Sequence, residues 1–72
     1  MTILHPDLTE ALTERERQIL RLMAEGHRER EIAPQLYLSY SHVRYTVTVI
    51  LAKLHVRTRC HAIAVAVRRG II

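Results

Sequence analysis

The segment that most constrains the fold of this 72-residue chain is YTVTVIL, residues 45–51. Its β-branched and aromatic residues favour a strand. A strand here would be isolated, because no other segment has the pattern of a pairing partner, and its backbone groups would remain unpaired. The apolar pattern also continues to Leu54, which makes the segment too long for an ordinary strand. We therefore expect a helix, and with it an all-α fold.

A helix from about Ser41 to Leu54, projected at about 100° per residue, has two different faces. The apolar stripe expected to face the core consists of Val43, Val47, Ile50 and Leu54. The residues expected to face outward, with Arg44 at their flank, are Ser41, Tyr45, Thr48, Val49 and Ala52. Ser39 and Ser41 each offer a side-chain oxygen for capping the start of this helix.

The chain before this helix divides into an arm and a first helix. Residues 1–12 lack a clear period and are expected to form a flexible arm or linker, which leaves residues 13–72 as one domain. The sequence TERE at residues 13–16 is a capping box, and Gly26 suits a left-handed helix end. We therefore expect the first helix at residues 13–25.

Two shorter helices complete the pattern. One is expected at residues 29–36, where Pro34 is tolerated only in a first turn, so the helix should start late, near residues 30–31, or be bent. The other is expected at residues 59–69, with Thr58 as its cap.

The helix at residues 59–69 is apolar almost all round. Its expected inward face consists of Ala62, Ile63, Ala66 and Val67, and the opposite face consists of Cys60, His61, Ala64 and Val65. A surface helix of a small monomer does not need a second apolar face. This second face is either a homodimer contact or the exposed side of a helix packed on a shallow core, and the pattern alone does not decide between them.

The charge distribution indicates a polyanionic partner. The net charge is +4, and all seven Asp and Glu residues lie within the first 31 positions. The later part contains only cations among its Asp, Glu, Lys and Arg residues, namely Arg44, Lys53, Arg57, Arg59, Arg68 and Arg69. Charge of one sign on part of a small domain is typical of a protein that binds nucleic acid, although a solvated basic surface is common too.

Several functions are disfavoured by composition. A small chain without Trp or Phe has a marginal core and little room for a catalytic pocket. No catalytic triad, phosphate-binding loop or paired carboxylates are recognisable, so we expect a binding module, with no cofactor, rather than an enzyme. His55, Cys60 and His61 match no standard zinc spacing, so no metal site is expected.

The compartment is expected to be the reducing interior of a cell. The start of the chain lacks the basic and apolar regions of a signal peptide, and no apolar run approaches the roughly 20 residues of a membrane span. The lone Cys60 permits no intrachain disulfide.

From residue 12 onward, several motifs occur in one register: LTERE at the opening, AEG at the first helix end, EIA, LS, HVR, KLHV and finally Arg59 with Ala62. Together they resemble the LuxR/GerE-type DNA-binding domain of bacterial transcription regulators. The resemblance implies a four-helix, tetrahelical helix-turn-helix domain that binds double-stranded DNA with its third helix in the major groove. It also implies a homodimer through the fourth helix, RNA polymerase as a further partner, and a place on the bacterial nucleoid in the cytoplasm.

The resemblance and the outward face together give candidate contact residues. Base contacts are expected from Arg44, Tyr45 and Thr48, because a guanidinium can bind guanine bidentately and a tyrosine ring or threonine methyl can meet a thymine methyl. Phosphate contacts are expected from Arg30, Ser39, Ser41, His42, Lys53 and Arg57. The homodimer contact is expected at His61, Ala64, Val65 and Arg68.

The chain departs from the family pattern at several of these places. His42 replaces the usual Thr, Thr46 replaces the usual His, and His55 replaces the usual Gly, where a positive φ would carry modest strain. Glu29 would repel a phosphate and leave that contact to Arg30 alone. These departures alter the expected target sequence more than the fold.

An alternative function is a helix-turn-helix-like protein-interaction module that does not bind DNA. Its support is the apolar character of the expected outward face, where Val49 and Ala52 lie beside Tyr45. DNA binding depends steeply on salt, whereas apolar docking does not.

Overall fold

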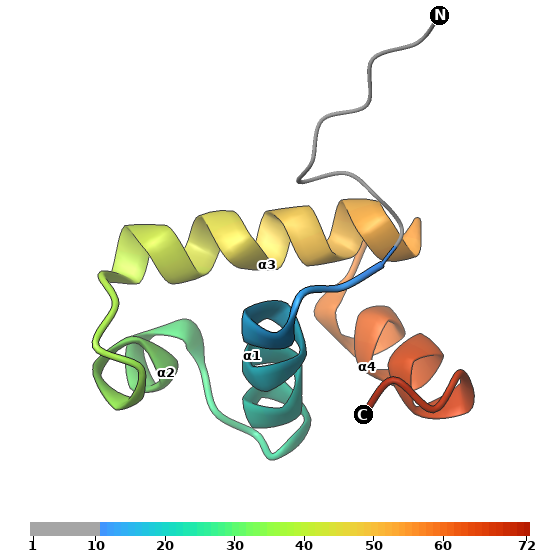
Figure 1. Ribbon diagram of the computed structural model, residues 1–72, viewed down its shortest axis with the longest axis horizontal. Coiled ribbons are helices and arrows are strands. Elements are labelled where there is room, and N and C mark those ends of the chain that lie inside the picture. The colour runs from blue at the N-terminus through green and yellow to red at the C-terminus, as the bar shows by residue number, and fades with distance from the viewer. Residues whose placement is uncertain (1–10) are drawn as a thin grey trace, which may run out of the picture.

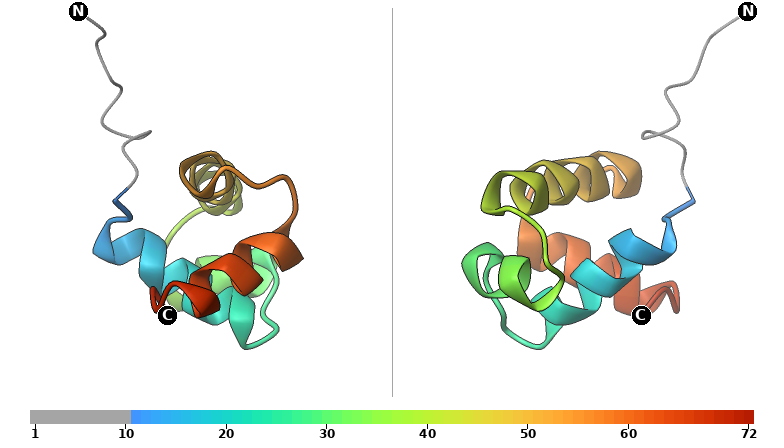
Figure 2. Two further views of the ribbon diagram at one scale, coloured as in Figure 1. Left: turned by 90° about the vertical axis from the view of Figure 1, so that its right-hand side faces the viewer. Right: turned by 60° about the vertical axis from the view of Figure 1, so that its left-hand side comes forward.

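The computed structural model describes residues 11–72, and these residues form four helices without a strand. The helices are α1 (Glu14–Ala24), α2 (Glu29–Gln35), α3 (Tyr40–Leu54) and α4 (Arg59–Arg68). The longest helix, α3, lies across one side of the molecule and contacts each of the other three (Figures 1 and 2). The expected all-α architecture is confirmed.

The core lies between α3 and the other helices. The largest fully buried side chains come from α1, α2 and α3: Ile19, Leu20, Ile32, Val43 and Ile50. The whole predicted inward stripe of α3 is buried. Burial of one such aliphatic side chain contributes about 1.5–3 kcal/mol, which exceeds the few tenths that a β-branched residue costs a helix. Packing therefore makes YTVTVIL helical despite its preference for a strand.

The start of α1 is closed by the predicted capping box. The Thr13 hydroxyl accepts a hydrogen bond from the Glu16 N–H at 3.1 Å, and the Thr13 N–H donates to the Glu16 carboxylate at 2.8 Å. Gly26 ends the helix with a φ of +98°, as expected. Of the arm predicted at residues 1–12, residues 1–10 lie outside the described residues, whereas Leu12 is buried in the core and so packs with the domain.

Of the two alternatives expected for α2, a late start or a bend, the late start is wrong. The helix begins at Glu29 and has Pro34 near its C-terminal end. The proline ring removes only the N–H that would have bonded to the Arg30 carbonyl, and a helix of seven residues ends one position later. The cost of the proline is therefore limited to one hydrogen bond at the edge of a short helix.

Left-handed residues delimit α3 at both sides. Ser39, not Ser41, is its cap: the Ser39 hydroxyl accepts from the His42 N–H at 3.0 Å. His55 has the positive φ that the family comparison made conceivable, at 58°, and Tyr37 in the turn after α2 has the same value. Nothing in the residue pattern indicates the positive φ of Tyr37, because Tyr is an unusual residue in this region of φ.

Three side chains on α3 and α4 point opposite to their predicted directions. Val49, expected to face outward, is only 6% exposed because the start of α1 covers that flank of α3, where Arg15 and Glu16 lie beside it. On α4, Val65 is 6% exposed and Val67 is 58% exposed, the reverse of the prediction. A helix that is apolar all round carries no information about its orientation, so only its contacts with α1 and α3 fix the buried face.

Candidate nucleic-acid interface

The exposed side of α3 begins at the first turn of the helix. Its exposed residues are Tyr40, Ser41, His42, Arg44, Tyr45, Thr48 and Ala52. Neither α3 nor α4 contains an acidic side chain, since none occurs in the sequence after Glu31. The surface is thus polar and cationic at its start, and it carries Tyr45, 58% exposed, near its middle.

An arginine of α2 joins this surface. The Arg30 guanidinium carbon lies 5.7 Å from the centre of the Tyr40 ring, and the Arg44 guanidinium carbon lies 5.7 Å from the same centre. Both distances are within the range of a cation–π interaction. Arg30 and Arg44 come from different helices, and the tyrosine ring brings their charges together.

Two threonines of α3 use their hydroxyl hydrogens within the helix. Thr48 donates to the Arg44 carbonyl at 3.1 Å, and Thr46 donates to the His42 carbonyl at 2.9 Å. Thr46, where the family usually has His, is buried, so this departure from the family pattern lies inside the domain and not on the exposed surface of α3. Thr48 is exposed and keeps its methyl group and an accepting oxygen for a partner.

Lys53 does not suit the phosphate contact that we expected. The residue is 2% exposed, and its ammonium donates to the Glu16 carboxylate at 2.7 Å and to the Ala11 carbonyl at 3.2 Å. A phosphate could reach this ammonium only by displacing both partners. Lys53 instead joins the end of α3 to the start of α1.

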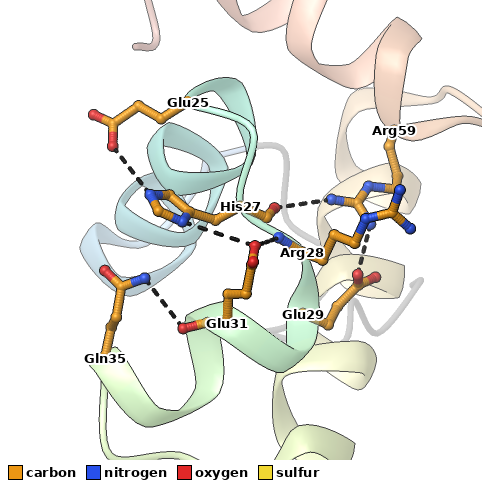
Figure 3. Close-up of polar contacts among 7 residues, drawn as sticks. All are labelled: Glu25, His27, Arg28, Glu29, Glu31, Gln35 and Arg59. Atoms are coloured by element: carbon orange, nitrogen blue, oxygen red, sulfur yellow. Dashed lines mark hydrogen bonds and ion pairs between the residues drawn. The ribbon is translucent and has the colours of Figure 1, made fainter.

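Arg59 of α4 holds the start of α2 in place (Figure 3). Its guanidinium donates to the Glu29 carboxylate at 2.5 Å and to the His27 carbonyl at 3.2 Å. The Arg28 N–H donates to the Glu31 carboxylate at 2.9 Å, which caps the helix. The negative charge of Glu29 is therefore paired, and the repulsion of phosphate that we expected from it is reduced.

The remaining predicted residues lie on two other parts of the surface. Arg57 is exposed in the connection between α3 and α4. His61, Ala64 and Arg68 are exposed on α4, but Val65 belongs to the core and is unavailable to a partner subunit. The exposed Val67 is the aliphatic side chain that α4 offers in its place.

Two residues that sequence analysis did not assign to this surface belong to it. Arg15 of α1 is exposed and lines a hollow with His42 and Tyr45 of α3. Its place in the LTERE motif was the available indication. Tyr40, the aromatic residue between the two arginines, had no such indication, because its contacts depend on how α2 packs against α3.

The described residues hold no sign of a metal centre or a membrane span. No three His, Cys, Asp or Glu side chains between residues 11 and 72 gather closely enough to bind a metal ion. No helix within the same residues is long and apolar enough to cross a membrane.

A short helix, a tight turn and a longer helix with an exposed cationic start define a helix-turn-helix DNA-binding domain, which α1 and α4 complete. The family described as bacterial regulatory proteins, luxR family, matches residues 10–66 of the chain. The chain belongs to this family of DNA-binding transcription regulators.

Relatives and a solved structure agree with this assignment. The chain is 39% identical to the transcriptional regulatory protein YxjL of Bacillus subtilis over 66 residues, which are 92% of this chain and 30% of YxjL. It is also 39% identical to the response regulator VraR of Staphylococcus aureus over 66 residues, which are 92% of this chain and 32% of VraR. A crystal structure of the response regulator ChrA of a heme-sensing two-component system matches with a TM-score of 0.83 and 34% identity, over 86% of this chain and 31% of ChrA. The chain therefore spans about a third of the length of these proteins.

Proposed function

We propose that the chain regulates transcription by binding specific sequences of double-stranded DNA as a homodimer, with α3 of each copy in a major groove. The observation that carries this proposal is the exposed start of α3, where Arg44 and Arg30 of α2 meet at the Tyr40 ring, and Arg15 of α1 lines a hollow with His42 and Tyr45. A helix fits the major groove of B-DNA, and cations beside it neutralise the phosphates on either side.

The exposed residues divide by what their side chains can contact. Arg44 suits bidentate hydrogen bonds to guanine, and Tyr45 and the Thr48 methyl suit thymine methyl groups. The proposed phosphate contacts, which fix the orientation of the domain on the duplex, are Arg30, Ser39, Ser41, His42 and Arg57. Lys53 is not among them, because its ammonium is buried against Glu16.

The alternative of a protein-interaction module loses its main support. It rested on an apolar outward face of α3, and Val49, the largest aliphatic residue of that face, is buried. The outward residues that remain exposed are largely polar or cationic. DNA binding is the function that this surface fits better.

The test is titration of DNA selected from a random pool, at low and moderate salt, with the wild type and Arg44→Ala. The wild type should bind and weaken steeply as salt rises, because phosphate contacts release counterions. Arg44→Ala should lose about 1–3 kcal/mol of discrimination at one base pair. Arg69→Ala makes the same charge change at the end of α4, which lies away from α3 in Figures 1 and 2, and should leave specificity unchanged. No binding of the wild type at low salt would refute the proposal.

The homodimer contact is proposed on the exposed side of α4. Its residues are His61, Ala64, Val67 and Arg68, with Val67 replacing the buried Val65. Two copies related by a two-fold axis would bind half-sites about one helical turn apart. RNA polymerase is a further proposed partner, because a transcription regulator acts on that enzyme.

Sedimentation of Val67→Glu on selected DNA tests the dimer. A glutamate at an exposed site leaves the fold intact but places two like charges across a two-fold contact, so the variant should bind as a monomer and with lower affinity. A Val67→Thr control keeps the shape without the charge. A Val67→Glu variant that sediments on DNA as the wild type does would exclude this face of α4 as the homodimer contact.

A further inference from the structure

The two arginines beside Tyr40 have no carboxylate partner among the described residues. The ion pairs of the neighbouring elements use Arg59 and Lys53, with Glu29 and Glu16 respectively, whereas Arg30 and Arg44 each contact the Tyr40 ring. Tyr40 is the first residue of α3, and Arg44 follows it by one helical turn on the same helix. Arg30 approaches the ring from α2.

We propose that Tyr40 is a positioning residue that holds Arg30 and Arg44 as one unit, and thereby couples the phosphate contact of α2 to the base contact of α3. This inference rests on the proposed function, since it assigns a partner to both cations. Tyr40 itself is not required to touch DNA in this scheme.

The physical basis is that a long cationic side chain loses rotamer freedom when it binds, and loses less when it is already held. A guanidinium that packs on an aromatic ring keeps the N–H groups at its edge available for a bidentate acceptor. Two cations near one ring also repel each other, and the negative face of the ring offsets this repulsion. Tyr40 therefore organises both arginines without occupying the groups that bind phosphate or guanine.

Coupling has a specific consequence for DNA recognition. Phosphate contacts without sequence information dominate non-specific binding, whereas the base contact distinguishes one site from another. When the ring is lost, both charges remain and non-specific binding should change little. The specific complex, which needs Arg44 in one orientation relative to Arg30, should weaken by about three- to tenfold.

The experiment compares Tyr40→Leu and Tyr40→Phe with the wild type in the full chain. Affinities are measured for a selected DNA site and for a scrambled duplex of equal length, each over a range of salt. Phe keeps the ring and removes the hydroxyl, whereas Leu keeps an apolar side chain and removes the ring. Tyr37→Leu is the matched control, because it removes a tyrosine that is 95% exposed in the adjacent turn.

We expect Tyr40→Leu to lose about three- to tenfold in the ratio of specific to non-specific affinity, with an unchanged salt slope. Tyr40→Phe should keep the wild-type ratio, and so should Tyr37→Leu. An equal loss in Tyr40→Phe would mean that the hydroxyl acts directly on DNA and would overturn the proposal. An unchanged ratio in Tyr40→Leu, or an equal loss in Tyr37→Leu, would overturn it as well.

A measurement without DNA separates this inference from the proposed function. The side-chain protons next to the guanidinium groups of Arg30 and Arg44 should show ring-current shifts by NMR in the wild type and in Tyr40→Phe, but not in Tyr40→Leu. Absence of these shifts in the wild type would overturn the positioning role even if DNA is bound. Shifts in a wild type that binds no DNA at low salt would leave the stacking intact and refute the proposed function, and with it the coupling.

Discussion

Arg44 and Lys53 are cations of the same helix in opposite situations. Arg44 lies near the start of α3, is exposed, and contacts the ring of Tyr40. Lys53 lies near the end of α3, is buried, and donates to Glu16 of α1 at 2.7 Å. The first charge is available to a partner molecule, whereas the second is neutralised inside the domain. One helix therefore carries an exposed cation, proposed for DNA recognition, and a buried structural cation.

The difference arises from where the acidic residues are. Glu16 lies in the first turn of α1, which covers the flank of α3 near Lys53 and Val49. At the other end of α3, α2 presents Arg30, while Glu29 of that helix pairs with Arg59. The net charge of a segment thus says little about function until the pairing of each group is known.

The largest effect that this comparison predicts is the loss of stability in Lys53→Met. Removal of one partner from a buried ion pair leaves the Glu16 carboxylate buried without a cation beside it, at a cost of about 3–5 kcal/mol. A domain of this size has little more stability than that, so the variant should be largely unfolded. Urea denaturation followed by circular dichroism measures the change.

The double variant Glu16→Gln/Lys53→Met is the control for this prediction. Glutamine retains an acceptor for the Thr13 N–H of the capping box, and no buried charge remains, so much of the lost stability should return. A loss below about 1 kcal/mol in Lys53→Met alone would contradict the assignment of Lys53 as a structural residue.

Arg44→Met should show the opposite behaviour. Its unfolding free energy should stay within about 0.5 kcal/mol of the wild type, because the side chain is on the surface. Its discrimination between the selected site and a mismatched site should fall by about 1–3 kcal/mol. Both the unfolding free energy and the discrimination are measured on one preparation of Arg44→Met. A fall in stability without a fall in discrimination would show that Arg44, like Lys53, is a structural residue.

Arg57→Ala is expected to change the salt dependence instead of the specificity. If it contacts phosphate as proposed, Arg57, which lies outside α3, should contribute about 0.9 to the slope of log affinity against log salt and little to the choice of base. Titrations at several salt concentrations measure the slope. A change of sequence preference with an unaltered slope would place Arg57 among the base contacts.

The smallest effect is expected for the exposed ion pair of α1. The hydrogen bond and charge of Arg17 lower the pKa of Glu14 below its ordinary value of 4.5, so the ionised carboxylate favours the folded state above this pH, and the gain is lost as pH falls through the lowered pKa. Glu14→Gln should therefore lower the stability slightly at neutral pH, have almost no effect below the lowered pKa, and so flatten the acid limb of the stability curve. Denaturation curves above and below pH 4.5 test this, and a loss comparable to that of Lys53→Met would show that burial does not separate the two pairs.

The sequence was sufficient for features that depend on local chemistry. The capping box at Thr13, the left-handed Gly26 and the inward stripe of α3 all follow from residue type and spacing. The family motifs added the order of the helices in a helix-turn-helix domain. These features need no knowledge of where another helix packs.

Features that depend on a second helix were mispredicted. A projection of α3 alone assigns Val49 to solvent, and Lys53 was expected to contact phosphate, but the start of α1 covers both side chains. The predicted orientations of Val65 and Val67 were reversed, because α4 has apolar residues on every side. Tyr40 escaped notice because the arginine that meets it from α2 is ten positions earlier in the chain.

The junction between α1 and α3 has a consequence for local unfolding. Helix termini usually fray, and their amide hydrogens then exchange with water much faster than those of the core. Here the carboxylate of Glu16 accepts both the Thr13 N–H and the Lys53 ammonium, which also reaches the Ala11 carbonyl. The first turn of α1 cannot open without exposing a buried ammonium of α3. The amide hydrogens at the start of α1 and at the end of α3 should therefore exchange with water only as the whole domain unfolds.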